Sequence, residues 1–147
     1  MASFQWVILC ERAVVEEGAK TVSLISILEN IQLPVPPHTV QKASPPVLVP
    51  LRFFVVHQWS RSNLKSGERQ AGRLRFLGPR GEFATQSFVV DLTDSQRTRL
   101  IGQTIGFPLQ GPGLYQCVVE AKGKSRWRKV GSTEFNVVYL PESKTRH

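Results

Sequence analysis

The chain has 147 residues, 41% of them hydrophobic and 20% charged, and its formal net charge is +8 at pH 7. This length and composition predict a single folded domain and exclude a disordered chain. No run approaches the roughly 18 consecutive apolar residues of a transmembrane helix, and the apolar residues 4–10 are too few for the core of a secretion signal, so we expect a cytoplasmic protein.

Most segments of the chain place apolar side chains with a period near two, which is typical of β-strands. The run 71–77 shows this pattern best, because Leu74 and Phe76 should face a core while Arg73 and Arg75 face solvent. We expect eight such strands, at residues 4–12, 21–31, 51–59, 71–77, 83–92, 100–107, 113–121 and 129–140.

Proline and glycine mark the irregular parts of the chain. Residues 33–50 hold six of the ten prolines, and because proline donates no hydrogen bond within a sheet, we expect a long extended connection there. Gly102 and Gly106 interrupt the run 100–107, which predicts an irregular strand or a strand at the edge of a sheet.

Many short strands and no long segment with a 3.6-residue period predict an all-β protein. We expect a two-sheet antiparallel β-sandwich of about eight strands, immunoglobulin-like or Greek-key, with a closed barrel as the alternative. Residues 1–140 would form this single domain and residues 141–147 a flexible C-terminal tail.

The run 112–117 resembles the start of an immunoglobulin-like strand. In such strands a tyrosine, here Tyr115, precedes a core cysteine, here Cys117, by two residues and hydrogen-bonds back to the preceding turn.

Basic residues are concentrated in alternate connections between the predicted strands. If neighbouring strands run antiparallel, the first, third, fifth and seventh connections lie at one end of the domain, where loops commonly bind ligands. Residues 60–70, 93–99 and 122–128 carry net charges of +2, +1 and +4, whereas residues 13–20 carry −1. The alternative is that these charges only keep the protein soluble. The candidate anion-binding residues are Arg61, Lys65, Arg69, Arg97, Arg99, Lys122, Lys124, Arg126 and Arg128.

Two tryptophans border the basic loops and are candidates for stacking on a ligand ring. Trp59 ends one predicted strand, and Trp127 lies within the loop 122–128. Lys and Arg neutralise phosphates, while an indole stacks on a nucleobase. If both indoles are exposed, carbohydrate binding is a further hypothesis.

The sequence contains no pattern that indicates an enzyme, a cofactor or a metal site. His38, His57 and His147 are far apart, and the two cysteines form no Cys-x-x-Cys pair. Gly-x-Ser-x-Gly, the phosphate loop and the dinucleotide fingerprint are all missing. Cys10 and Cys117 lie in apolar runs, where we expect free thiols, with a disulfide between them as the alternative.

Two stretches resemble a family of small uncharacterised bacterial proteins thought to be β-sandwiches. The first is Cys10-Glu11 followed by residues 22–31, Val-Ser-Leu-Ile-Ser-Ile-Leu-Glu-Asn-Ile. The second is residues 112–115, Pro-Gly-Leu-Tyr, with the closing hairpin that ends at residues 134–137. The resemblance implies the same fold but no known activity, so no functional residue is carried over from it.

The leading functional hypothesis is a non-enzymatic protein-interaction or assembly module, whose partner is another protein or a second copy of the chain. Exposed strand edges, above all that of the run 100–107, would allow a partner strand to extend the sheet. The competing hypothesis is binding of an anion or nucleic acid at the basic end, which would weaken steeply as salt rises.

Overall fold

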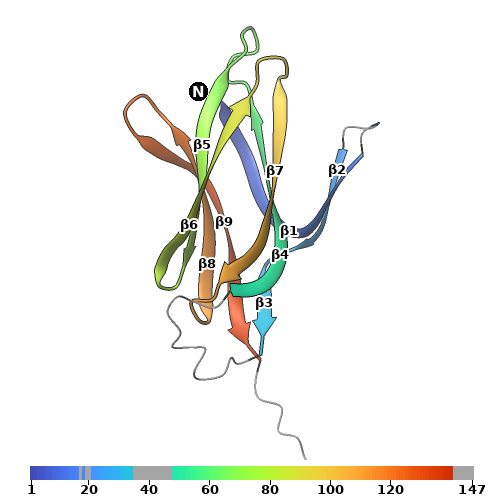
Figure 1. Ribbon diagram of the computed structural model, residues 1–147. Helices are drawn as coiled ribbons and strands as arrows, with labels where there is room; N and C mark the ends of the chain where they lie inside the picture. Colours follow the sequence, from blue (N-terminus) through green and yellow to red (C-terminus); the bar gives the residue numbers. More distant parts are fainter. Residues whose placement is uncertain (17, 19–20, 35–47, 141–147) are drawn as a thin grey trace, which may run out of the picture.

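The computed structural model describes residues 1–16, 18, 21–34 and 48–140, which form two β-sheets (Figure 1). In this part of the chain there is no helix long and apolar enough to cross a membrane. The strands are β1 (Ser3–Glu16), β2 (Thr21–Ile27), β3 (Asn30–Leu33), β4 (Leu48–Ser60), β5 (Arg69–Gly78), β6 (Gly81–Asp91), β7 (Arg97–Pro108), β8 (Gly113–Lys122) and β9 (Trp127–Tyr139).

The two sheets have different sizes and shapes. One has the strand order β2-β1-β4-β7, and the other has the order β3-β9-β8-β5-β6. One of them is curled as a half-barrel. Neighbouring strands run antiparallel except β3 and β9, which are parallel. The prediction of an all-β protein with two sheets is therefore confirmed, whereas the prediction of wholly antiparallel pairing is wrong at β3.

The single strand predicted at residues 21–31 is two strands that belong to different sheets. Ser26 has a φ of 58°, a left-handed conformation that residues other than glycine rarely adopt, and β2 ends just after it. The backbone N–H of Leu28 then donates to the carbonyl of Leu9 (2.9 Å), and the Leu28 side chain enters the core. The break was missed in the sequence because the chain is apolar on both sides of it.

Several local predictions can be compared directly with the structure. Leu74 and Phe76 are buried, while Arg73 and Arg75 are only half-buried. β7, which contains the glycine-interrupted run, is at the edge of its sheet as predicted.

The proline-rich connection between β3 and β4 is shorter than predicted. Leu33 belongs to β3 and residues 48–50 to β4, so the predicted connection 33–50 is shortened at both ends. Residues 35–47 and the predicted tail 141–147 lie outside the described residues.

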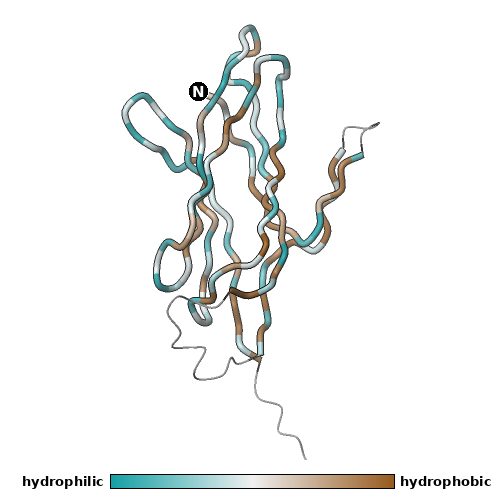
Figure 2. Tube along the Cα trace, viewed as in Figure 1, coloured by the Kyte–Doolittle hydropathy of each residue, from teal (hydrophilic) through white to brown (hydrophobic). Residues whose placement is uncertain are grey.

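The core lies between the two sheets and is rich in aromatic rings. Figure 2 shows brown apolar stretches within the strands of both sheets and teal polar stretches in several of the connecting loops. The ring of Tyr115 stacks on Phe135 with 5.4 Å between centroids, and Phe107 meets Tyr115 edge-on at 5.5 Å. These contacts join β7, β8 and β9, and so tie the two sheets together.

Tyr115 also forms the corner that the run 112–117 predicts. Its hydroxyl donates to the carbonyl of Gly111 (2.8 Å) and accepts from the backbone N–H of Gln110 (2.9 Å). Cys117, two residues later, is fully buried, and burial raises the pKa of its thiol to about 12. The tyrosine therefore fixes the loop between β7 and β8 against the start of β8.

Replacing Tyr115 with phenylalanine is expected to lower the free energy of unfolding by about 1–3 kcal/mol, because the part-buried N–H of Gln110 loses its acceptor. Urea denaturation followed by circular dichroism would measure this. Tyr139→Phe is the matched control, since the Tyr139 hydroxyl makes no hydrogen bond with the described residues. Equal losses in the two variants would contradict the proposed structural role of the corner.

Candidate functional site

Three of the predicted basic connections meet at one end of the molecule, which we call the basic end: the loops 61–68, 92–96 and 123–126. The first two are joined by the backbone, because Arg61 N–H donates to Gln96 O (2.9 Å) and Leu92 N–H to Glu68 O (2.8 Å). The third lies at the same end, since Met1 lies 3.5 Å from Glu68 and lines a depression together with residues 123–126. Arg61, Arg97 and Arg126 therefore share this end, as the charge pattern predicts.

The first predicted connection, residues 13–20, lies partly outside the described residues, and its residues 13–16 are not at the basic end. β1 begins there, since Ser3 lies opposite Ser60 at the end of β4, and it runs away from this end toward Glu16. The prediction assumed that strands alternate in direction along the chain. The additional strand β3 reverses the direction that the prediction gave to β1. Of the four predicted connections, the one assigned to the wrong end is the acidic one.

Arg61 is a structural residue and not a free cation. Its Nε donates to Leu92 O (2.8 Å) and its Nη2 to Thr93 O (2.6 Å), so the guanidinium fastens the loop 92–96 to the end of β4. The sequence does not distinguish this role from anion binding, because both use an arginine in a polar loop.

Two further candidate cations are also engaged or enclosed. Arg69 lies 3.7 Å from the carboxylate of Asp91, and both side chains are largely exposed, so the pair adds little stability. Arg99 is half-buried opposite Gln58, and its Nε is enclosed without a hydrogen bond from the described residues. Arg99 is therefore not available to a ligand in the way that the sequence pattern predicts, whereas Arg69 stays exposed beside a carboxylate.

The stacking prediction is wrong for Trp59, whereas for Trp127 it stays a prediction. Trp59 is fully buried, and its Nε1 donates to Nδ1 of His57 (2.8 Å). Trp127 is half-buried, and the guanidinium carbon of Arg73 lies 4.3 Å from the centroid of its ring. Carbohydrate binding through two exposed indoles is therefore excluded, because Trp59 is shielded by the core.

Six of the predicted cations remain exposed, without an ion pair to any carboxylate of the described residues: Lys65, Arg97, Lys122, Lys124, Arg126 and Arg128. The last three line the depression beside Met1, which has a volume of about 280 Å³. The structure thus concentrates the available positive charge on the hairpin between β8 and β9.

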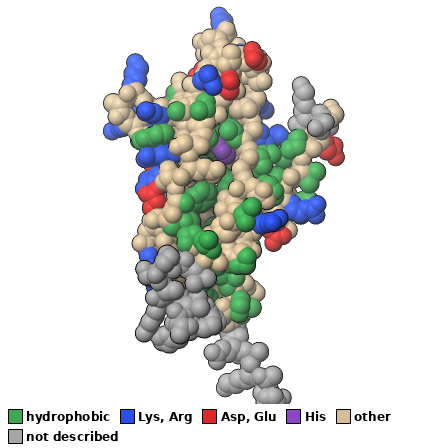
Figure 3. All heavy atoms as spheres, in the orientation of Figure 1, with side chains coloured by type: hydrophobic (Ala, Val, Ile, Leu, Met, Phe, Trp, Pro, Cys, Tyr) green, Lys and Arg blue, Asp and Glu red, His purple; other side chains and the backbone are tan. Residues whose placement is uncertain are grey.

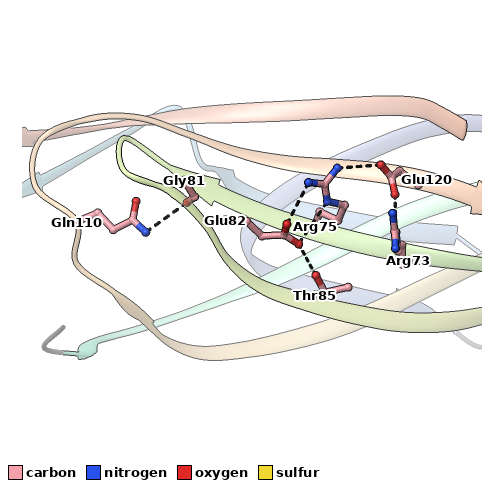
Figure 4. A network of polar contacts seen from close by, with 7 residues as sticks. All are labelled: Arg73, Arg75, Gly81, Glu82, Thr85, Gln110 and Glu120. Atoms are coloured by element: carbon pink, nitrogen blue, oxygen red, sulfur yellow. Dashed lines mark hydrogen bonds and ion pairs between the residues drawn. The ribbon is translucent and has the colours of Figure 1, made fainter. Parts of the chain in front are cut away.

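A network of ion pairs on the outer face of the larger sheet was missed in the sequence (Figure 4). Glu120 is only 7% exposed and accepts from Nε of Arg73 and from Nη1 of Arg75 (3.0 Å). Arg75 also pairs with Glu82 at 3.0 Å. Burial by itself would raise the pKa of Glu120, but the hydrogen bonds from the two arginines lower it. The sequence does not indicate these ion pairs, because they form between different strands and Glu120 is separated from both arginines by more than forty residues.

A second feature missed in the sequence is a seam between the edge strands β6 and β7. Two hollows of about 270 and 150 Å³ lie along it, the first lined by Phe83 and Ile105 and the second by His57, Phe88 and Ile101. Apolar side chains and the purple histidine are visible on this face in Figure 3. Burial lowers the pKa of His57 to about 4, so the imidazole is neutral at pH 7.

The described residues do not assemble a metal centre. No group of three His, Cys, Asp or Glu side chains among them could hold a metal ion, and His38 and His147 lie outside the described residues. Cys10 and Cys117 are buried free thiols. Burial raises the pKa of both, and a backbone hydrogen bond from Arg12 offsets part of the rise at Cys10, so neither resembles an activated nucleophile.

Fold and site together define an all-β, two-sheet protein with a basic hairpin at one end and an open edge between its sheets. No protein-family model and no curated protein matches the chain. A structure of Pseudomonas fluorescens alkylpurine DNA glycosylase AlkC bound to DNA containing an abasic site analog is similar at a TM-score of 0.47 and 12% sequence identity. The similar region covers 89% of this chain and 30% of the glycosylase. A likeness of this size defines neither a shared fold nor a shared activity.

Proposed function

We propose that this chain is a non-enzymatic assembly module that associates with a second copy of itself through the edge of β7. The observation that carries the proposal is the position of β7, which pairs with β4 and with no other described strand.

We also propose an immunoglobulin-like or Greek-key sandwich, which the tyrosine corner supports. We further propose a cytoplasmic location, which the free thiols support.

The outer edge of β7 has the chemistry of a strand-addition site. Half of the backbone N–H and C=O groups of an edge strand point away from the sheet and can pair with another strand. β7 is twelve residues long, which is longer than the short edge strands that proteins use to prevent such pairing. Its neighbour across the seam, β6, belongs to the other sheet and does not hydrogen-bond to it.

The side chains of β7 favour its own copy as the partner. Antiparallel pairing of two β7 strands about Gln103 places Ile101 of each chain opposite Ile105 of the other. These two side chains are 39% and 66% exposed, and cross-strand pairs of β-branched residues stabilise antiparallel strands. The arrangement has two-fold symmetry and closes as a dimer, so it does not propagate into a fibre.

Sedimentation velocity between about 5 and 200 µM tests this proposal, a range that detects dissociation constants typical of modest interfaces. The wild-type chain is expected to pass from monomer to dimer. Ile105→Lys places a charge opposite Ile101 of the partner at two symmetric positions, and should raise the dissociation constant about tenfold or more. Val138→Lys is the matched control, because Val138 is 47% exposed but lies on β9, which is paired on both sides.

Salt gives a second readout for the same association. Each chain has a net charge of +8, so two copies repel each other and the dimer should strengthen or stay constant as salt rises. A monomer throughout the concentration range, or equal effects of the two lysine variants, would refute assembly through β7.

A further inference from the structure

We propose that the hairpin between β8 and β9 binds the phosphate backbone of duplex nucleic acid, with Lys124, Arg126 and Arg128 as its principal cations. This site lies on a different surface from the β7 edge and does not depend on the dimer. Residues 122–129 form what we call the basic hairpin.

The basic hairpin is strongly and uniformly positive. It contains five basic residues and no acidic residue, and all five basic side chains are exposed: Lys122, Lys124, Arg126, Arg128 and Lys129. In Figure 1 it projects from the body of the larger sheet, and blue side chains gather on it in Figure 3. A protruding ribbon of one charge raises the local concentration of an oppositely charged ligand.

The hairpin is held in place by contacts at its tip and its root. Gly123 N–H donates to Arg126 O (2.8 Å), which closes the turn. At the root, Nε2 of the buried Gln70 donates to Lys122 O (2.8 Å), and the guanidinium of Arg73 covers the ring of Trp127. The cations are therefore presented on a preorganised ribbon, so less ordering accompanies binding.

The shape and chemistry of the basic hairpin fit a nucleic acid duplex better than other polyanions. A two-stranded β-ribbon fits the major groove of DNA, which is ~12 Å wide. Interfaces with nucleic acid are more polar and more positive than those with proteins, and the tip residues 123–126 include no apolar side chain that could enter a membrane or the core of a protein interface. The depression of about 280 Å³ beside Lys124, Arg126 and Arg128 extends the same positive surface toward Met1.

Fluorescence anisotropy with a labelled duplex of ~20 bp tests the proposal over ~50–200 mM salt, the range in which phosphate contacts change affinity steeply. The wild-type chain is expected to bind with micromolar affinity or better at the lower salt. Replacing Lys124, Arg126 and Arg128 together with glutamine should weaken binding on the order of 100-fold and reduce the salt slope by about 3.

The matched control removes the same charge elsewhere, by replacing Arg12, Arg52 and Arg80 with glutamine. These arginines are exposed and lie outside the basic hairpin, so the control should lose less than about threefold in affinity. Ser125→Glu, which adds a negative charge at the tip, gives a second test if the triple variant does not fold. Ile105→Lys should bind DNA as the wild type does, which separates this proposal from assembly through β7.

Three results would overturn the proposal. The first is no binding of the duplex at the lower salt. The second is an equal loss in the two triple variants, which would assign any binding to net charge alone. The third is tighter binding of heparin or of anionic lipid vesicles than of the duplex, with the same dependence on the basic hairpin.

Discussion

Trp59→Ala is expected to lower the free energy of unfolding by about 3–5 kcal/mol, a large part of the stability of a domain of this size. Trp59 has no exposed surface. Its ring meets Phe4 edge-on at 5.3 Å and lies 5.9 Å from Phe88, so its removal leaves a cavity that backbone strands on both sides keep from closing.

The change also affects His57. Nδ1 of His57 accepts the hydrogen bond of the Trp59 indole, and the imidazole is itself only 3% exposed. Without the indole, a buried acceptor loses its donor, which adds to the cost of the cavity. Urea denaturation followed by circular dichroism is the appropriate measurement, because it does not depend on the tryptophan that is removed.

Trp127→Ala is the control for this prediction. Trp127 is half-buried and has one face against Arg73, so its removal should cost only about 1 kcal/mol. If Trp59→Ala costs no more than Trp127→Ala, the assignment of Trp59 to the core would be wrong, and a ligand-stacking role would have to be considered again.

Trp59 also illustrates what the sequence could predict. The alternation along residues 51–59 places Trp59 on the same face as Phe53 and Val55, which are buried. The two-residue period of this run therefore predicts that Trp59 is buried. Its position at the end of the predicted strand, beside a basic loop, instead suggested a stacking role. The strand continues to Ser60, so the tryptophan lies inside the sheet.

The basic end was predictable for a different reason. Chain reversals are local events, and the turns from β4 through β9 were placed correctly, so every second loop among them could be assigned to the same end. The step from β2 to β3 could not be predicted in the same way. It depends on a backbone conformation at Ser26 and on a hydrogen bond between Leu28 and Leu9, neither of which has a residue pattern.

Pairwise contacts between distant strands were the hardest to predict. Arg73 and Arg75 were correctly placed on the outer face of β5, but nothing in the sequence pairs them with Glu120 on β8. The register that brings them together is fixed by the packing of the whole sheet. The distinction between free cations and structural ones, such as Arg61, has the same origin, because it depends on which carbonyl groups the fold places nearby.

Glu120→Gln is expected to lower the free energy of unfolding by about 2–4 kcal/mol at pH 7, since it removes the charge that two arginines share. The side chains of Arg73 and Arg75 are 28% and 30% exposed. They stay partly hydrated, which keeps the loss below that of a fully buried pair. Glu134→Gln is the control, because Glu134 is exposed and has no ion pair with the described residues, and it should change stability by less than ~0.5 kcal/mol.

The pH dependence of the stability difference between wild type and Glu120→Gln tests whether the charge of Glu120 is the cause of that difference. The pKa of Glu120 is lower in the folded chain than in the unfolded chain, so its contribution is complete above the unfolded pKa of about 4.3 and is lost as pH falls through the folded pKa. The difference between wild type and Glu120→Gln should therefore shrink between pH 5 and pH ~2. His57 titrates alike in both proteins and cancels. A difference that stays constant on acidification would show that Glu120 stabilises the sheet by packing and not by its charge.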